Sequence, residues 1–298
     1  MKINPNKCRS LLFTPAHIEK FWSKAISSEA DILVLDLEDA VPQNKKEEAR
    51  KNIPMLLKAK PSSRPLLLRV NNVKSLLFKE DIKIAMSDGI EGIIIPKLNS
   101  RKEIEDVIKA IEEVKIQISK PSFDFSIFLM IETAQALYNI KDLSNFSRHI
   151  KGLIFGHEDY LFDIGGAELP NNENLIYPRS EIVVSAKSNN LICIDTPFLD
   201  ISDSKGCYKH ALHGRKLGFN GMLVIHPNQV FDSNKGYSPS KQEIIESIEI
   251  VNIAKNSSLL GRSIAVSGGK FVAPPIIKQA NQLLARAKAL NLIDDLVS

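Results

Sequence analysis

Charged residues stand at the ends of short hydrophobic runs in this chain. Arg69 closes the run PLLLR, Lys97 closes GIIIPK, and Glu132 follows SIFLMI. In a barrel of parallel strands the carboxyl ends of all strands converge on one mouth, which is where such folds carry out their chemistry. We therefore expect these side chains to meet at one site.

Glu132 and Asp159 are carboxylates that end two consecutive hydrophobic runs. Side by side they would repel unless a cation lies between them, and an all-oxygen site with room for water and substrate suits Mg²⁺. We expect both residues to hold Mg²⁺, and Glu132 also to contact the substrate. The alternative is that each carboxylate caps a helix or pairs with an arginine. His157 is more simply a packing or hydrogen-bonding residue, since zinc takes more nitrogen or sulfur ligands.

Arg69 lies in wholly apolar surroundings, LLRV. An unpaired guanidinium is expensive to bury, so Arg69 must face a carboxylate of the protein or of a substrate. Bidentate binding of a substrate carboxylate is the functional interpretation. An ion pair with Glu38 or Asp39 is the alternative, and both can hold at once.

The segment DLED supplies three further acidic residues. Side chains alternate along a strand, so Asp36 and Glu38 share one face while Asp39 points to the other. We expect Glu38 to act as a catalytic residue, by orienting Arg69 or binding a substrate hydroxyl. Asp39, at the start of the next loop, is a candidate for substrate binding. Asp195 and His226 end the last two runs, where each could also simply fix a loop by hydrogen bonding.

Eight hydrophobic runs alternate with amphipathic stretches, and they cover residues 10–14, 32–39, 65–71, 92–97, 126–133, 152–159, 191–197 and 221–227. Eight strand–helix units are the number that a closed (β/α)8 TIM barrel requires. The runs are continuously hydrophobic, as buried parallel strands should be. An open doubly wound sheet is the alternative. We expect the barrel over residues 1–260, and a hairpin and helix over residues 261–298 as a lid or oligomerisation segment of the same domain.

The composition of this 298-residue chain restricts the classes of partner that it can be expected to bind. It is 44% hydrophobic and 25% charged, with a formal net charge of +4. The lysines are spread along the expected helices, and no basic block with interleaved aromatic residues occurs, so we expect no nucleic-acid partner. Three cysteines without a C-x-x-C pair favour a reducing compartment. No signal peptide or run long enough to span a bilayer is evident, so we expect a cytoplasmic protein without a membrane partner.

Seven motifs occur in the order typical of one family. They are RSLLFTP (9–15), DLEDAV (36–41), RVN (69–71), IPK (95–97), IETA (131–134), FGHEDY (155–160) and IHPNQ (225–229). Over about residues 9–287 the chain resembles the citrate lyase beta-subunit family of the HpcH/HpaI aldolase group, including its free-standing members. The resemblance implies a TIM barrel that assembles as homotrimers or hexamers. It also implies Mg²⁺ at Glu132 and Asp159, keto-acid binding by Arg69, and Arg9 and Glu38 as further active-site residues, Arg9 binding substrate.

The reaction implied by the resemblance is the cleavage of a 3-hydroxy-acyl thioester of citryl, citramalyl or malyl type. The products would be a 2-keto acid and a short acyl thioester, carried by coenzyme A or an acyl carrier protein. A mildly positive chain suits such a polyanionic ligand.

One position departs from the family pattern. The stretch GGKFVAPP has Ala273 where the family carries an Asp that acts as acid or base in a neighbouring active site. Alanine cannot transfer a proton, so protonation of the enolate carbon must use another group or water, or the activity is altered. The alternatives are therefore a non-catalytic or regulatory subunit that binds Mg²⁺ and a keto acid, and an aldolase that acts on free hydroxy-keto acids.

Overall fold

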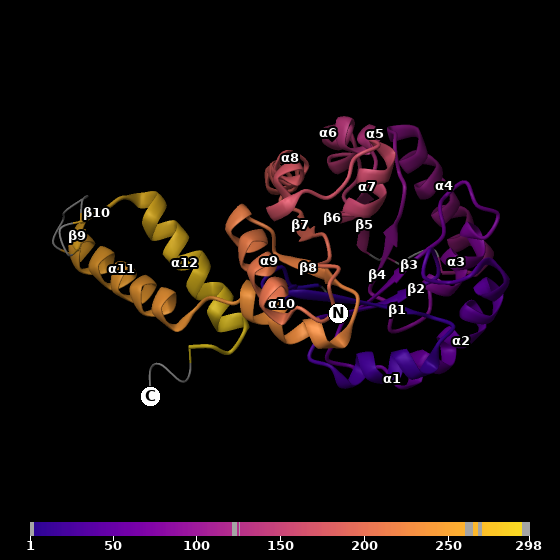
Figure 1. The fold of residues 1–298 in the computed structure, drawn as a ribbon, viewed down its shortest axis with the longest axis horizontal. Helices are drawn as coiled ribbons and strands as arrows, with labels where there is room; N and C mark the ends of the chain where they lie inside the picture. The colour runs from indigo at the N-terminus through magenta and orange to yellow at the C-terminus, as the bar shows by residue number, and fades with distance from the viewer. Residues whose placement is uncertain (1–2, 121–123, 125, 260–264, 268–269, 294–298) are drawn as a thin grey trace. The chain divides into compact units, whose positions relative to one another are not determined.

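The computed structural model describes residues 3–120, 124, 126–259, 265–267 and 270–293. Eight parallel strands close into a barrel in which β1 pairs with both β2 and β8, and helices enclose them (Figure 1). The expected (β/α)8 TIM barrel is confirmed. The strands are β1 (Ser10–Pro15), β2 (Ile32–Asp36), β3 (Leu66–Arg69), β4 (Gly92–Ile95), β5 (Ser126–Ile131), β6 (Ile150–Phe155), β7 (Ile192–Asp195) and β8 (Gly221–Val224).

Helices follow every strand of the barrel, some of them preceded by short 3₁₀ turns. They are α1 (Glu19–Ser27), η1 (Gln43–Lys45), α2 (Lys46–Lys58), α3 (Phe78–Ala85), α4 (Arg101–Gln117), α5 (Ala134–Tyr138), α6 (Ile140–Ser144), α7 (His157–Asp163), η2 (Pro170–Leu175), α8 (Ile176–Ser188), α9 (Ser204–Leu217), η3 (Pro227–Gln229) and α10 (Val230–Tyr237).

The barrel strands are hydrophobic at successive positions because both of their faces are buried. On β2, Ile32 and Val34 belong to the core inside the barrel, whereas Leu33 and Leu35 belong to the core between the barrel and its helices. Burial on both faces is the normal situation of a parallel sheet covered by helices. The continuous hydrophobic runs of the sequence therefore have a direct physical cause.

The chain divides into two compact units, residues 1–237 and 238–298. The second unit contains α11 (Lys241–Leu259), an antiparallel hairpin of β9 (Ala265–Ser267) and β10 (Lys270–Val272), and α12 (Pro274–Ala289). The sequence pattern favours a helix at residues 238–256 as the partner of the last strand, but α10 is the helix that packs against β8 and α9. The C-terminal hairpin and helix are present as expected. Their use as a lid or oligomerisation segment of the barrel domain stays a prediction.

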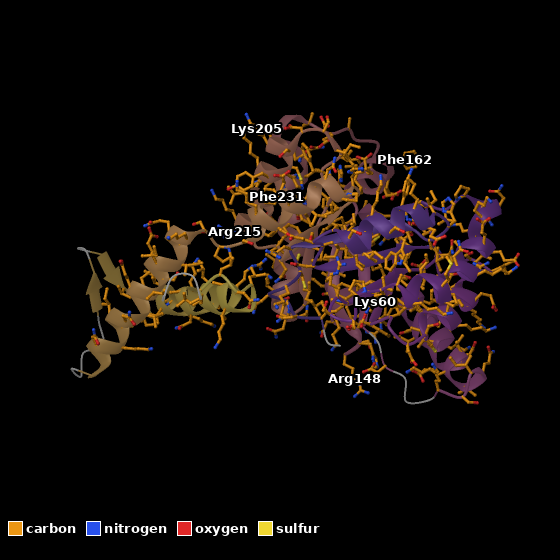
Figure 2. All side chains as sticks on the ribbon, turned by 90° about the horizontal axis from the view of Figure 1, so that it is seen from below. Lys60, Arg148, Phe162, Lys205, Arg215 and Phe231 are labelled. Carbon is orange, nitrogen blue, oxygen red and sulfur yellow. The ribbon has the colours of Figure 1, made fainter. Side chains whose placement is uncertain are left out.

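The two ends of the barrel can be told apart by the segments that enter and leave the strands. Arg148 precedes β6 and lies at one edge of the unit in Figure 2, whereas Phe162 and Lys205 come after β6 and β7 and lie at the opposite edge. The second edge is the mouth, where the strands end. In the part of the chain that the structure describes, no helix is long and apolar enough to cross a membrane.

Candidate active site

A cavity of about 400 Å³ opens at the mouth of the barrel. Its described lining comes from seven of the eight strands or the segments after them, so it brings together residues that are distant in sequence. The charged residues of the lining are Lys24, Asp36, Arg69, Glu132, Glu158 and Asp159.

Arg69 and Asp36 form an ion pair that lines this cavity. They are the last residues of β3 and β2 and are paired in register. Arg69 donates from Nε at 2.7 Å and from Nη2 at 2.5 Å to the two carboxylate oxygens of Asp36. Burial lowers the pKa of Arg69, but the charges of Asp36 and Glu38 outweigh this effect and raise it above its ordinary value. The guanidinium, 5.0 Å from the centre of the Phe13 ring, is therefore permanently charged.

Glu38 and Asp39 contact the cations next to this ion pair. Glu38 lies 3.3 Å from Arg69 Nη1, and its other oxygen accepts a hydrogen bond from Lys97 Nζ at 2.9 Å. The same ammonium donates to Asp39 at 2.8 Å. Neither acidic residue lines the cavity. The structure therefore places Glu38 and Asp39 behind Arg69 and Lys97, where they can orient these two cations.

Glu132 follows β5 and has two differently bound oxygens. Oε1 accepts a hydrogen bond from the backbone N–H of Lys97 at 2.6 Å, whereas buried Oε2 has no partner among the described residues. Burial, followed by the negative charge of Asp159, raises the pKa of Glu132 to about 8. An unsatisfied buried carboxylate oxygen beside a second carboxylate is costly, and a bound cation would remove that cost.

The carboxylates of Glu132 and Asp159 fit a magnesium ion. Asp159 lies in the first turn of α7, directly after β6, and lines the same cavity as Glu132. Gly156 leaves space next to Glu132 Oε2, since a Cβ atom at this position would come within 2.8 Å of that oxygen. Two carboxylates with space for water and substrate oxygens are the ligands that Mg²⁺ prefers.

The predicted site residues are only partly brought together. Arg69, Glu132 and Asp159 share the cavity, while Glu38 and Asp39 adjoin it. Arg9 does not: it precedes β1, at the opposite end of the barrel, and its guanidinium pairs with Asp31 at 2.8 Å. The expectation that Arg9 binds substrate is corrected by this placement, because a residue before a strand lies at the end remote from the mouth.

Sequence reasoning missed two partners of the site. It paired Arg69 with Glu38 or Asp39, but the bidentate partner is Asp36. The sequence also places Lys97 at a strand end but does not predict that it binds Glu38, Asp39 and Glu132. The sequence could have indicated Asp36 as a partner of Arg69, because Asp36 and Glu38 lie on the same face of one strand. Asp36 is the last residue of β2, the strand next to β3.

Polar residues after β6, β7 and β8 are held by other parts of the barrel. His157 Nδ1 shares a hydrogen bond with the Thr196 hydroxyl, and burial lowers the pKa of His157. Asp195 pairs with Arg179 inside the protein. His226 accepts a hydrogen bond from the backbone N–H of Asn228 at 3.2 Å and so begins η3. These contacts agree with structural roles for His157 and Asp195.

The fold and the cavity define a TIM barrel with two carboxylates and an arginine at its mouth. Residues 9–227 match the family model described as HpcH/HpaI aldolase/citrate lyase. The chain belongs to this family.

Curated relatives are similar over nearly the whole chain. The chain is 26% identical to the citrate lyase subunit beta of Leuconostoc mesenteroides, over 96% of this chain and 95% of that protein. It is 29% identical to the human mitochondrial citramalyl-CoA lyase, over 95% of this chain and 86% of that protein. The crystal structure of CitE from Mycobacterium tuberculosis in complex with magnesium, acetoacetate and coenzyme A has the same fold, with a TM-score of 0.77 and 23% identity over 94% of this chain and 97% of that chain.

Proposed function

We propose that the protein is a magnesium-dependent carbon–carbon lyase that cleaves a 3-hydroxy-acyl thioester into a 2-keto acid and a short acyl thioester. The observation that carries this proposal is the unpaired, buried Oε2 of Glu132 beside Asp159 and close to the Arg69 guanidinium. The names of the relatives, citrate lyase subunit beta and citramalyl-CoA lyase, support the same reaction class.

The bond changes of this cleavage are simple. The 3-hydroxyl group loses its proton, its oxygen becomes the keto oxygen, and the bond between C3 and the α-carbon of the thioester breaks. The electron pair of that bond moves to the thioester as an enolate, which then takes up a proton. When bound, Mg²⁺ would stabilise the negative charge that develops on the oxygens of the departing keto acid.

Arg69 binds the carboxylate of the keto-acid portion in this proposal. Its Nε and Nη2 donate to Asp36, and Nη1 lies 3.3 Å from Glu38 and 3.9 Å from Met130 Sδ, so the guanidinium is fixed at the cavity wall by three residues. Asp36 and Glu38 hold the plane of the guanidinium in place before substrate arrives. A fixed donor of this kind contributes about 2–4 kcal/mol to a developing anion.

Glu132 and Asp159 would hold the metal, and Lys97 fixes the first of them. The backbone N–H of Lys97 occupies Oε1 of Glu132, which leaves Oε2 for the cation. Glu38 and Asp39 act through Arg69 and Lys97 as positioning residues.

The remainder of the cavity suits an acyl thioester. Away from the carboxylates its lining is largely apolar and includes Phe13, Pro15, Phe21, Pro197 and Leu223. The acyl carrier would be coenzyme A or an acyl carrier protein. We further propose a cytoplasmic homotrimer or hexamer, which light scattering would test by giving a mass of three or six times 33.2 kDa.

The test is keto-acid release from citryl-, citramalyl- and malyl-coenzyme A, with Mg²⁺ and with excess chelator. The proposal predicts that one of the three substrates releases its keto acid, and only in the presence of Mg²⁺. Release that continues undiminished in chelator would contradict it.

A second candidate rests on Ala273. This residue precedes α12 as its N-cap and offers no group that can transfer a proton. The candidate is a non-catalytic or regulatory subunit that binds Mg²⁺ and a keto acid. Mg²⁺-dependent keto-acid binding without cleavage of any of the three thioesters would favour it. Cleavage of free hydroxy-keto acids alone would instead indicate an aldolase.

A further inference from the structure

We infer that the site selects a monocarboxylic 2-keto acid with a small alkyl group, of the pyruvate type, so that its thioester substrate is citramalyl rather than citryl or malyl. This inference rests on the proposed function and concerns the same cavity. It follows from the charges of the cavity lining and from the side chains beside Arg69.

The described lining of the cavity is poorer in cations than in carboxylates. Among the described residues, its lining carries four carboxylates, two cationic side chains and two histidines, a net charge of −2 when the histidines are neutral. Arg69 is already balanced by Asp36. Lys24 is exposed and lies in the last turn of α1, the helix that follows β1. In the closed barrel, β1 lies opposite β5, the strand that Glu132 follows.

A bound divalent cation would bring the net charge of this lining to zero. A monocarboxylic keto acid would then leave one negative charge, whereas a dicarboxylic acid such as oxaloacetate would leave two. The second carboxylate would lose water contacts, and exposed Lys24 would be the one cation of the described lining left to compensate it, so its burial is disfavoured. The electrostatics of the cavity therefore oppose a dicarboxylic product.

The side chains around the Arg69 guanidinium are apolar. Met130 Sδ lies 3.9 Å from Arg69 Nη1, and the Phe13 ring lies on the guanidinium. Leu223 lines the same cavity and belongs with Met130 to the core inside the barrel. In the proposed binding mode, a keto acid whose carboxylate binds Arg69 would have its substituent beside these side chains. They favour a methyl group over the hydrogen atom of glyoxylate, because burying one carbon strengthens binding about three- to tenfold.

The test is calorimetric titration of pyruvate, glyoxylate and freshly prepared oxaloacetate into the full-length protein with saturating Mg²⁺. We expect pyruvate to bind about three- to tenfold more tightly than glyoxylate, and at least about tenfold more tightly than oxaloacetate. Binding of oxaloacetate or glyoxylate as tight as that of pyruvate would overturn the inference and leave the proposed function intact. If none of the three binds in a Mg²⁺-dependent manner, the proposed function fails as well.

A matched pair of variants tests whether the side chains beside Arg69 cause the selectivity. Met130→Ala and Met222→Ala each truncate a buried methionine of a barrel strand, but only Met130 lines the cavity, while Met222 packs in the core outside the barrel. We expect Met130→Ala to reduce the preference for pyruvate over glyoxylate to about twofold or less, and Met222→Ala to leave it unchanged. Leu223→Ala replaces Met130→Ala if that variant does not fold. An unchanged preference in the cavity variant, or equal changes in both variants of the pair, would overturn this origin of the selectivity.

Discussion

At the scale of single residues, Lys97 connects the two halves of the site. Its ammonium group binds Glu38 and Asp39, and its backbone N–H binds Glu132. The residue has a φ of 55°, in the left-handed region that a side chain other than glycine enters only at a cost. The ion pairs and the hydrogen bond to Glu132 offset that cost. The metal ligand and the support of Arg69 therefore depend on one residue.

The two functions of Lys97 can be separated experimentally. Lys97→Met removes the ammonium and keeps the backbone N–H, so we expect the Kd of a keto acid to rise about tenfold while Mg²⁺ binding changes less than about threefold. Titration calorimetry measures both constants. Lys83→Met, at an exposed pair with Glu80, is the control and should change neither. An equal loss of both affinities in Lys97→Met would show that the side chain also holds Glu132.

Glu132 also determines how metal binding depends on pH. Its pKa is about 8 in the metal-free protein, so the carboxyl is mostly protonated at pH 7 and must release its proton when the cation binds. The affinity for Mg²⁺ should therefore rise about tenfold per pH unit up to pH 8, and level off above it. Titrations at pH 6.5, 7.5 and 8.5 test this. Affinities that stay constant across these three values would contradict the raised pKa.

At the scale of elements, the strands were predictable and the last barrel helix was not. Burial on both faces makes all eight strands continuously hydrophobic, so their positions are evident in the sequence. Helix α10 contains Ser233, Asn234 and Gly236, which are weak helix formers, and it is stabilised instead by packing on α9 and β8. Such tertiary packing leaves no local signal, and the sequence favours the longer α11 in its place.

Some residues of the candidate site could likewise be predicted from the sequence, and others could not. Glu132, Asp159 and Arg69 could be found because each follows a recognisable strand. The sequence favours Glu38 or Asp39 as the ionic partner of Arg69, and the register between β2 and β3 brings Asp36 beside it instead. Arg9 was assigned by resemblance alone, and its position before β1 argues against the role.

The pair of Arg179 and Asp195 joins two of these elements, α8 and β7, and tests their packing. Both side chains are fully buried, and the guanidinium donates to both oxygens of the carboxylate. Asp195→Ala leaves an uncompensated buried guanidinium, so we expect the free energy of unfolding to fall by about 3–5 kcal/mol. Urea denaturation measures this change. Lys51→Ala, at the exposed pair with Glu47, should cost less than about 1 kcal/mol; a comparably small effect of Asp195→Ala would contradict the account.

At the scale of the whole molecule, closure of the barrel makes the site. The pairing of β1 with β8 brings the ends of the first and last strands to the same mouth as those of β5 and β6. Eight strands in sequence predict this closure by their number. The second unit, residues 238–298, carries Ala273, the position at which the resemblance to the family leads us to expect an Asp.

Restoring the family residue tests what this departure costs. We expect Ala273→Asp to raise the turnover of the preferred thioester by about 10- to 100-fold, because a positioned acid or base accelerates proton transfer. The Mg²⁺-dependent affinity for the keto acid should stay unchanged, since Arg69, Glu132 and Asp159 all belong to the barrel unit. Ala273→Asn is the control of equal size without the proton. Equal turnover in the wild type and both variants would mean that another group already handles the proton.

The central claim is that Glu132 and Asp159 hold the metal that binds the keto acid, and one titration tests it most directly. Pyruvate is titrated with saturating Mg²⁺ into the wild type, into Asp159→Asn and into Asp142→Asn, which alters an exposed aspartate of α6. We predict that Asp159→Asn weakens Mg²⁺-dependent binding at least about 100-fold, because it removes one of two charged ligands, and that Asp142→Asn binds as the wild type does. Binding by Asp159→Asn with the affinity and the metal dependence of the wild type would contradict the account.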